Sequence, residues 1–136
     1  MAKLSLGDLD KQFVATTDTY ELFVGENNAG KDIVFTIGRT GSPEHEKVMR
    51  KYSKQVERVR RDSDKYHRIL VTIAAKSLLI GWDGLIDDDG KKVPCTLENR
   101  ISVLFDYREL FNLVIGTAAD TSLFRDEEEE EESEKN

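Results

Sequence analysis

A possible phosphate-binding segment occupies residues 25–32, GENNAGKD. Its two glycines and the lysine after them match all but the last position of the nucleotide-binding pattern G-x-x-x-x-G-K-[ST]. A phosphate loop leads into a helix, because the N–H groups of the helix N-terminus bind the phosphates. Here Lys31 is followed by the alternating residues of a strand, and Asp32 stands where a hydroxyl would hold Mg²⁺. We therefore predict a hairpin loop that binds no nucleotide.

Residues 87–90, DDDG, offer carboxylates that could hold calcium. If Gly90 is the glycine at position six of an EF-hand loop, positions one and twelve fall on Leu85 and Thr96. Neither residue supplies a carboxylate, so the pattern fails at both ends. A solvated acidic turn is the prediction for this segment.

The remaining reactive side chains are few and scattered. One cysteine, Cys95, cannot form an internal disulfide, and it stands with only two histidines, His45 and His67. Both histidines lie among charged neighbours near predicted helix starts, which favours surface positions. No spacing suggests a nucleophile with its base or a metal-ligand cluster. We expect no catalytic residue, no cofactor and no metal, and hence no enzyme.

The charge of the chain is concentrated at its C-terminal end. The sequence has 27 acids, 20 bases and a net charge of −7. Residues 126–136 hold eight acids and one lysine, which leaves 19 acids and 19 bases elsewhere. We expect one globular domain over residues 1–124 and a disordered acidic tail over residues 125–136. No apolar run reaches the roughly 18 residues that span a bilayer, and no signal-peptide core is present, so a soluble cytoplasmic protein is expected.

Apolar periodicity predicts a β-hairpin and then helices. Strands are predicted near residues 20–24 and 32–37. Ser42 and Pro43 then begin a long helix, on which Val48, Tyr52, Val56 and Val59 form one apolar stripe. A second helix, from about 65 to 80, is apolar almost all round, as expected of a buried central helix, and Gly81 is predicted to end it.

The C-terminal part is predicted to be a loop followed by two short helices. The loop covers residues 81–94, and Thr96 caps the helix that follows. Asp106 and Glu109 have capping-box spacing for the last helix. The predicted fold class is α+β, mainly α: an N-terminal β-hairpin near 20–37 and about four helices over 43–118, packed around the buried central one.

Partner binding is the chemistry that the chain best supports. Residues 39–68 carry ten bases and five acids, and nucleic-acid binding through the basic helix 47–61 is the alternative function. No motif of aromatic stacking residues accompanies this helix. A solvated, salt-bridged face, with Glu57 and Arg61 at i and i+4, and a protein-binding face both remain open. Trp82 fits either a core anchor or an interface residue. The candidate partner-binding residues are Arg50, Lys51, Lys54, Arg58, Arg61, Trp82 and Leu85.

The segment from about residue 65 to residue 124 resembles a known family. An apolar helix runs into G-W-x-G and an acidic turn with a glycine, and then come V-P, a threonine cap and E-N. A short helix pair follows and ends in small residues and a phenylalanine. This arrangement resembles the tail assembly chaperones of long-tailed bacteriophages.

The resemblance implies a protein of the infected bacterial cytoplasm that is absent from the finished virion. Such chaperones coat the long helical tape-measure protein, help recruit tail-tube subunits and self-associate into curved or spiral homo-oligomers. They are often also made as a longer form by ribosomal frameshifting. An A-rich codon run over Glu134, Lys135 and Asn136 would permit such a frameshift here.

Overall fold

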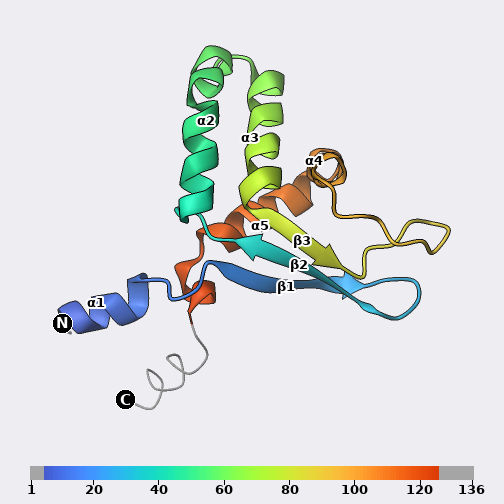
Figure 1. Cartoon of the computed structure of the whole chain (residues 1–136), viewed down its shortest axis with the longest axis horizontal. Helices are drawn as coiled ribbons and strands as arrows, with labels where there is room; N and C mark the ends of the chain where they lie inside the picture. The colour runs from blue at the N-terminus through green and yellow to red at the C-terminus, as the bar shows by residue number, and fades with distance from the viewer. Residues whose placement is uncertain (1–4, 126–136) are drawn as a thin grey trace.

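A three-stranded antiparallel sheet and a projecting helical hairpin organise the chain (Figure 1). The computed structural model describes residues 5–125. Residues 126–136 of the predicted acidic tail (125–136), and with them the codon run at 134–136, lie outside the described residues. The elements in chain order are α1 (Leu6–Phe13), β1 (Thr19–Glu26), β2 (Asp32–Gly38), α2 (Pro43–Val59), α3 (Ser63–Ser77), β3 (Leu79–Asp83), α4 (Leu97–Asp106), α5 (Arg108–Ala119) and the 3₁₀ helix η1 (Thr121–Phe124).

The predicted N-terminal hairpin is confirmed. Strand β1 pairs antiparallel with β2, and the loop between them closes through a hydrogen bond from Asn27 N to Lys31 O of 2.8 Å. The Asn27 side-chain oxygen also accepts from Ala29 N and Lys31 N, and Gly30 has a φ of 78° that favours glycine. Since Lys31 enters a strand, the helix N-terminus of a phosphate loop is missing at this place.

A third strand, β3, replaces the predicted end of the central helix. Helix α3 ends at Ser77 rather than near residue 80, and Gly81 lies within β3, opposite Thr36 of β2. The free edge of β2 explains the difference, because its unpaired backbone groups are satisfied by a further strand. The chain crosses tightly at this point: a Cβ on Gly38 would lie 2.4 Å from the Ser77 carbonyl oxygen.

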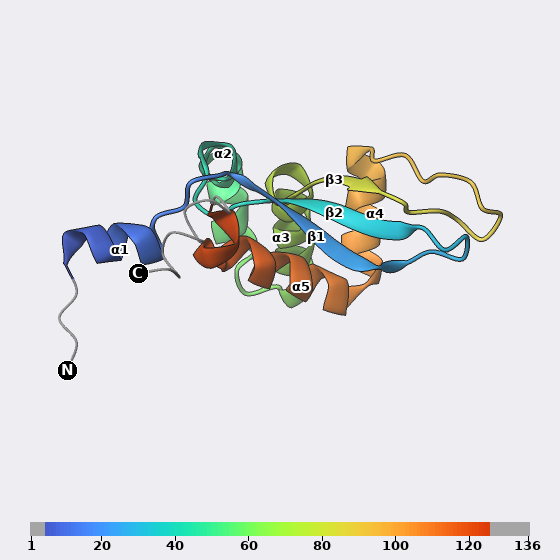
Figure 2. The same cartoon turned by 90° about the horizontal axis from the view of Figure 1, so that it is seen from below.

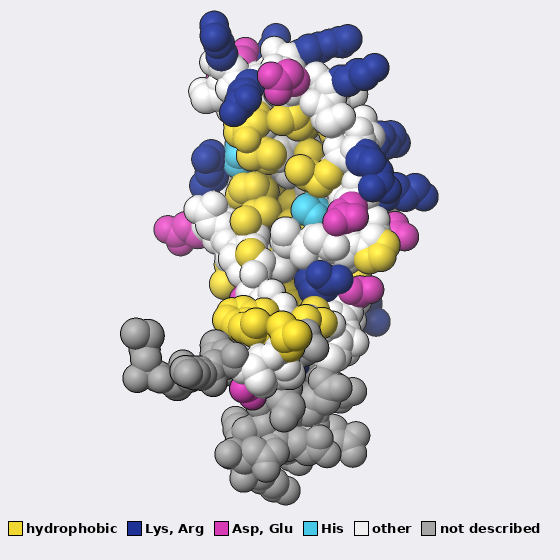
Figure 3. Space-filling model, turned by 90° about the vertical axis from the view of Figure 1, so that its left-hand side faces the viewer, with side chains coloured by type: hydrophobic (Ala, Val, Ile, Leu, Met, Phe, Trp, Pro, Cys, Tyr) yellow, Lys and Arg dark blue, Asp and Glu magenta, His cyan; other side chains and the backbone are white. Residues whose placement is uncertain are grey.

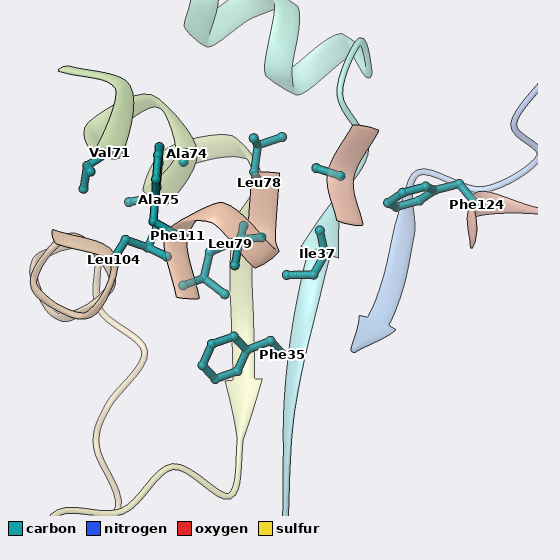
Figure 4. Close-up of a cluster of buried hydrophobic side chains, with 12 residues drawn as sticks. Phe35, Ile37, Val71, Ala74, Ala75, Leu78, Leu79, Leu104, Phe111 and Phe124 are labelled. Carbon is teal, nitrogen blue, oxygen red and sulfur yellow. The ribbon is translucent and has the colours of Figure 1, made fainter. Parts of the chain in front are cut away.

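The hydrophobic core lies between the sheet and the helices. Figure 2 shows α5 running along one face of the sheet, and Figure 4 shows the buried side chains gathered from α3, β2, β3, α4 and α5. Phe124 of η1 closes the cluster beside β1, with its ring 6.1 Å from that of Tyr20. The buried core side chains include Phe35, Ile37, Val71, Ala74, Leu79, Leu104, Phe111, Val114 and Phe124. The predicted fold class, α+β and mainly α, is confirmed.

The helix starts agree with the sequence at two places and differ at a third. The side chain of Ser42 accepts from His45 N at 3.2 Å, and that of Thr96 accepts from Asn99 N at 3.1 Å, so both predicted N-caps are confirmed. The predicted capping box of Asp106 is wrong. Asp106 is the last residue of α4, and α5 begins directly after Tyr107, which makes no side-chain capping bond.

Candidate partner-binding groove

An apolar groove opens where α2, α3 and α5 meet. It has a volume of about 330 Å³. Helix α2 packs along α3 and buries none of its own residues fully, and this helical hairpin stands above α5 (Figure 1). The side chains that define the groove are His45 and Met49 of α2, Leu70 and Ile73 of α3, and Phe111 and Ile115 of α5.

The groove has a buried floor and an exposed apolar rim. Ile73 and Phe111 are only 3% and 6% exposed, whereas Met49 and Ile115 are 42% and 37% exposed. Figure 3 shows this side of the molecule, where hydrophobic side chains form a strip with Lys and Arg side chains on both sides. An apolar strip of this kind, bordered by polar residues, is typical of a protein-binding surface.

His45 marks one end of the groove and is neutral. Its Nδ1 accepts a hydrogen bond from Gly41 N at 3.1 Å, which requires this nitrogen to be unprotonated. Burial lowers the pKa of His45 below its ordinary value of 6.5, and the Glu46 carboxylate opposes this shift only in part. Because its second ring nitrogen then carries the proton, His45 can donate a hydrogen bond to a ligand.

His67 packs between aromatic rings on the Phe111 side of the groove. Its ring centroid lies 5.7 Å from that of Phe105 and 5.2 Å from that of Phe111. Burial lowers the pKa of His67, and the Arg108 guanidinium lowers it further. Both histidines lie at the surface, as expected, but His45 and His67 are each partly covered by their neighbours.

The basic side of α2 is exposed and largely free of ion pairs among the described residues. Glu57 lies 3.9 Å from Arg60, and not beside Arg61, because α2 ends at Val59 and Arg61 lies past the last turn. Two ammonium groups, those of Lys51 and Lys76, lie over the Tyr52 ring at 5.8 and 4.9 Å. The candidate cations are all exposed: Arg50, Lys51, Lys54, Arg58 and Arg61.

Trp82 and Leu85 do not join this surface. They lie at the end of β3 and just after it, at the opposite end of the sheet from α2 (Figure 1). Trp82 Nε1 donates to Val93 O at 2.8 Å, and the indole packs 5.8 Å from the Phe35 ring. Val93 N donates in turn to Leu85 O at 3.0 Å. Trp82 therefore fastens the loop over residues 84–94 to the core, as one of the two sequence interpretations predicts.

Sequence reasoning missed the groove residues. Met49 lies beside the predicted stripe of α2 rather than on it, and four residues after His45, so the two share a second line on the helix. On α5, the apolar residues Leu113 and Ile115 extend beyond the buried face. The signal in the sequence is therefore that α2 and α5 each carry more apolar residues than one core-facing stripe needs.

The acidic turn at residues 87–90 is closed by hydrogen bonds of its own. The Asp87 side chain accepts from Asp89 N and Lys91 N, both at 2.9 Å, and so closes the acidic turn on itself. In this part of the chain no three His, Cys, Asp or Glu side chains gather as a metal-binding group. Cys95 is partly buried, which raises the pKa of its thiol. None of the described helices combines the length and apolar character needed to cross a membrane.

A family model described as YdaY prophage protein matches residues 42–136, which is more than half of the chain. The chain belongs to the YdaY prophage protein family. This YdaY-family protein is therefore phage-derived, as the resemblance implied. The match begins at Ser42, the N-cap of α2, so it takes in the three helices of the groove, whereas α1 and the β-hairpin precede it. No curated protein and no solved structure matches the chain.

Proposed function

We propose that this YdaY-family protein is a non-enzymatic tail assembly chaperone that binds the tape-measure protein and assists assembly of the tail tube. In this proposal it acts in the cytoplasm of the bacterial host, forms homo-oligomers and leaves before the virion is complete. The phage family and the sequence resemblance to tail assembly chaperones support the assignment. A longer, frameshifted form that engages the tail-tube protein is part of the same proposal.

The observation that carries the proposal is the apolar groove between α2, α3 and α5. An amphipathic helix binds such a groove by inserting apolar residues spaced three or four apart. A long helical partner offers that pattern repeatedly and aggregates when its apolar stripe is exposed. The exposed rim residues Met49 and Ile115 would cover part of the stripe.

Charge gives the groove a preference among helical partners. Arg50 follows Met49 directly on α2, and Arg108 lies one turn before Phe111 and Asn112 on α5. Both guanidinium groups are exposed, and neither forms an ion pair within residues 5–125. A helix with acidic residues beside its apolar stripe would fit this surface best.

Nucleic-acid binding through α2 is the less favoured alternative. The cations of α2 would attract phosphates, but an apolar groove beside them offers a nucleic acid no complementary surface. The acidic residues 126–136 would moreover compete with phosphates for the same cations. These features favour a protein partner.

Inactivation of the gene in an inducible prophage tests the proposal. Induced cells should make heads but no complete tails, and plasmid-borne wild-type protein should restore tail formation. Mass spectrometry should find the protein in the lysate and not in purified virions. Normal tails in its absence, or its presence as a stoichiometric virion component, would refute the proposal.

A further inference from the structure

We infer that the groove between α2, α3 and α5 takes helix α1 of a second copy of this chain. The inference rests on the proposed function, because it names the ligand that fills the same groove when the tape-measure protein is not bound. Two unpartnered apolar surfaces on one chain carry it: the groove and the exposed face of α1.

Helix α1 presents its large apolar side chains to solvent. Leu6, Leu9 and Phe13 are spaced three and four residues apart and so share one helix face. They are 82%, 38% and 65% exposed, and the next residue, Val14, is 50% exposed. Within the described chain α1 contacts mainly η1 and projects away from the sheet (Figures 1 and 2). A contiguous apolar face of this kind marks an interaction site.

The groove can accept the side chains that α1 offers. Its volume of about 330 Å³ is roughly twice that of a ~150 Å³ protein cavity that holds benzene. Two large side chains such as Leu9 and Phe13 therefore fit between Met49 and Ile115. The spacing on α1 is the one that helix-in-groove binding requires.

Charge favours the same pairing. The N–H groups of Thr16 and Thr17 donate to Phe124 O at 2.8 and 2.9 Å, which holds the chain after α1 against the chain before the acidic segment. The segment 126–136, which holds eight acids, follows Arg125 directly in the sequence. The groove of a second copy presents the exposed cations Arg50 and Arg108. The acids of this segment and the cations beside the groove have opposite charge, and both α1 and the groove present apolar side chains.

The same backbone bonds favour a second copy over the chain's own groove. Besides the two bonds to Phe124 O, Arg39 N donates to Asp18 O at 3.0 Å, so residues 16–18 are fixed beside η1 and β2. Only Val14 and Ala15 are then left to reverse the direction of α1. A second copy meets no such constraint.

Complementation between two variants tests the inference. Leu6→Glu with Phe13→Glu removes the apolar face of α1, and Met49→Glu removes the rim of the groove. All three side chains are exposed, so the fold should survive, which circular dichroism checks. The matched control is Phe23→Glu, a 60% exposed position on β1, away from both surfaces.

In sedimentation velocity the wild type and the control should self-associate alike. Each test variant alone should associate at least about tenfold more weakly, because each loses a central apolar anchor. An equal mixture of the two test variants should recover association as a discrete 1:1 pair, since one supplies an intact α1 and the other an intact groove. Recovery of the pair would support the inference.

Three results would overturn it. One is a wild-type chain that stays monomeric at all concentrations, which is also the result if α1 folds back onto its own groove. The others are test variants that associate like the control, and a mixture that stays monomeric. If the α1 variant self-associates normally and still keeps the tape-measure protein soluble, the inference fails and the proposed function stands. If the two test variants form the pair and the tape-measure protein stays insoluble beside the wild-type chain, the inference stands and the proposed function fails.

Discussion

Truncation of Trp82 shows whether this side chain stabilises the fold or forms part of an interface. The indole packs against Phe35 at a centroid distance of 5.8 Å and donates to Val93 O at 2.8 Å. Removal of a fully buried Trp side chain costs about 3–5 kcal/mol, and Trp82 is only partly buried, so Trp82→Ala should lose about 3 kcal/mol. Trp82→Phe keeps most of the packing and loses the hydrogen bond, for about 1–2 kcal/mol. A domain stabilised by about 5–15 kcal/mol should tolerate both changes.

Urea unfolding of these variants is followed by far-ultraviolet circular dichroism. Tryptophan fluorescence is unsuitable, because Trp82 is the only tryptophan of the chain and both substitutions remove it. The unfolding midpoint should fall from wild type to Trp82→Phe and further to Trp82→Ala. Self-association of the folded variants should match the wild type, since Trp82 lies at the opposite end of the sheet from α2 (Figure 1). Unchanged midpoints together with lost self-association would refute the reasoning and make Trp82 an interface residue.

Three further perturbations test the backbone at Gly84, the partly buried cation Arg100 and the neutral His45. Gly84→Ala should lower the free energy of unfolding by at least about 2 kcal/mol in a denaturant titration, because φ is +82° and the new Cβ would lie 2.1 Å from Asp32 O. The control Gly116→Ala meets no atom within 4 Å and should raise the free energy of unfolding by about 0.5–1 kcal/mol. Equal effects of the two substitutions would contradict the geometry. Arg100 donates two charged hydrogen bonds, to Ala75 O at 2.8 Å and to Leu79 O at 3.1 Å, which hold the end of α3 and the start of β3. Arg100→Met removes both and should lower the free energy of unfolding by about 2–4 kcal/mol in the same titration. An unchanged unfolding midpoint would refute this. Because the pKa of His45 is lowered in the folded state, the unfolded chain binds a proton at this residue more readily. The melting temperature should therefore fall as the pH drops below 6.5, and it should fall less in His45→Gln. An identical pH dependence of the two proteins would contradict the lowered pKa.

The hairpin and the helix starts could be predicted because their signals are local. Alternation in β2 places Phe35 and Ile37 in the core, and the turn residues between the strands fix the loop. The side chains of Ser42 and Thr96 bond to amides only three residues away. Such features depend on a few neighbouring residues, so a single sequence is enough to find them.

The third strand could not be predicted, because its cause lies far away in the chain. Residues 78–80 are apolar and continue the pattern of the helix, and only the free edge of β2 draws them into a strand. Arg100 adds to this effect by donating to Leu79 O from α4, 21 residues later. Helix α1 was missed for a related reason: it is short and has few contacts with the rest of the chain.

The groove depends on three helices at once, so the sequence shows its parts and not its shape. The sequence predicts a basic face on α2, and it does not show which apolar residues of α2 and α5 border a groove. The structure leaves Met49 and Ile115 exposed across a gap from each other. Whether a helix face is buried or forms a rim depends on how closely its neighbour approaches, and periodicity does not report that distance.

Co-expression with the tape-measure protein encoded by the same prophage tests the central claim most directly. The tape-measure protein should be insoluble alone, and it should become soluble and co-purify with the tagged wild-type protein. Met49→Glu together with Ile115→Glu should abolish co-purification, while the exposed control Phe23→Glu should retain it. A tape-measure protein that stays insoluble beside the wild-type protein, or one that co-purifies equally well with the groove variant, would contradict the account.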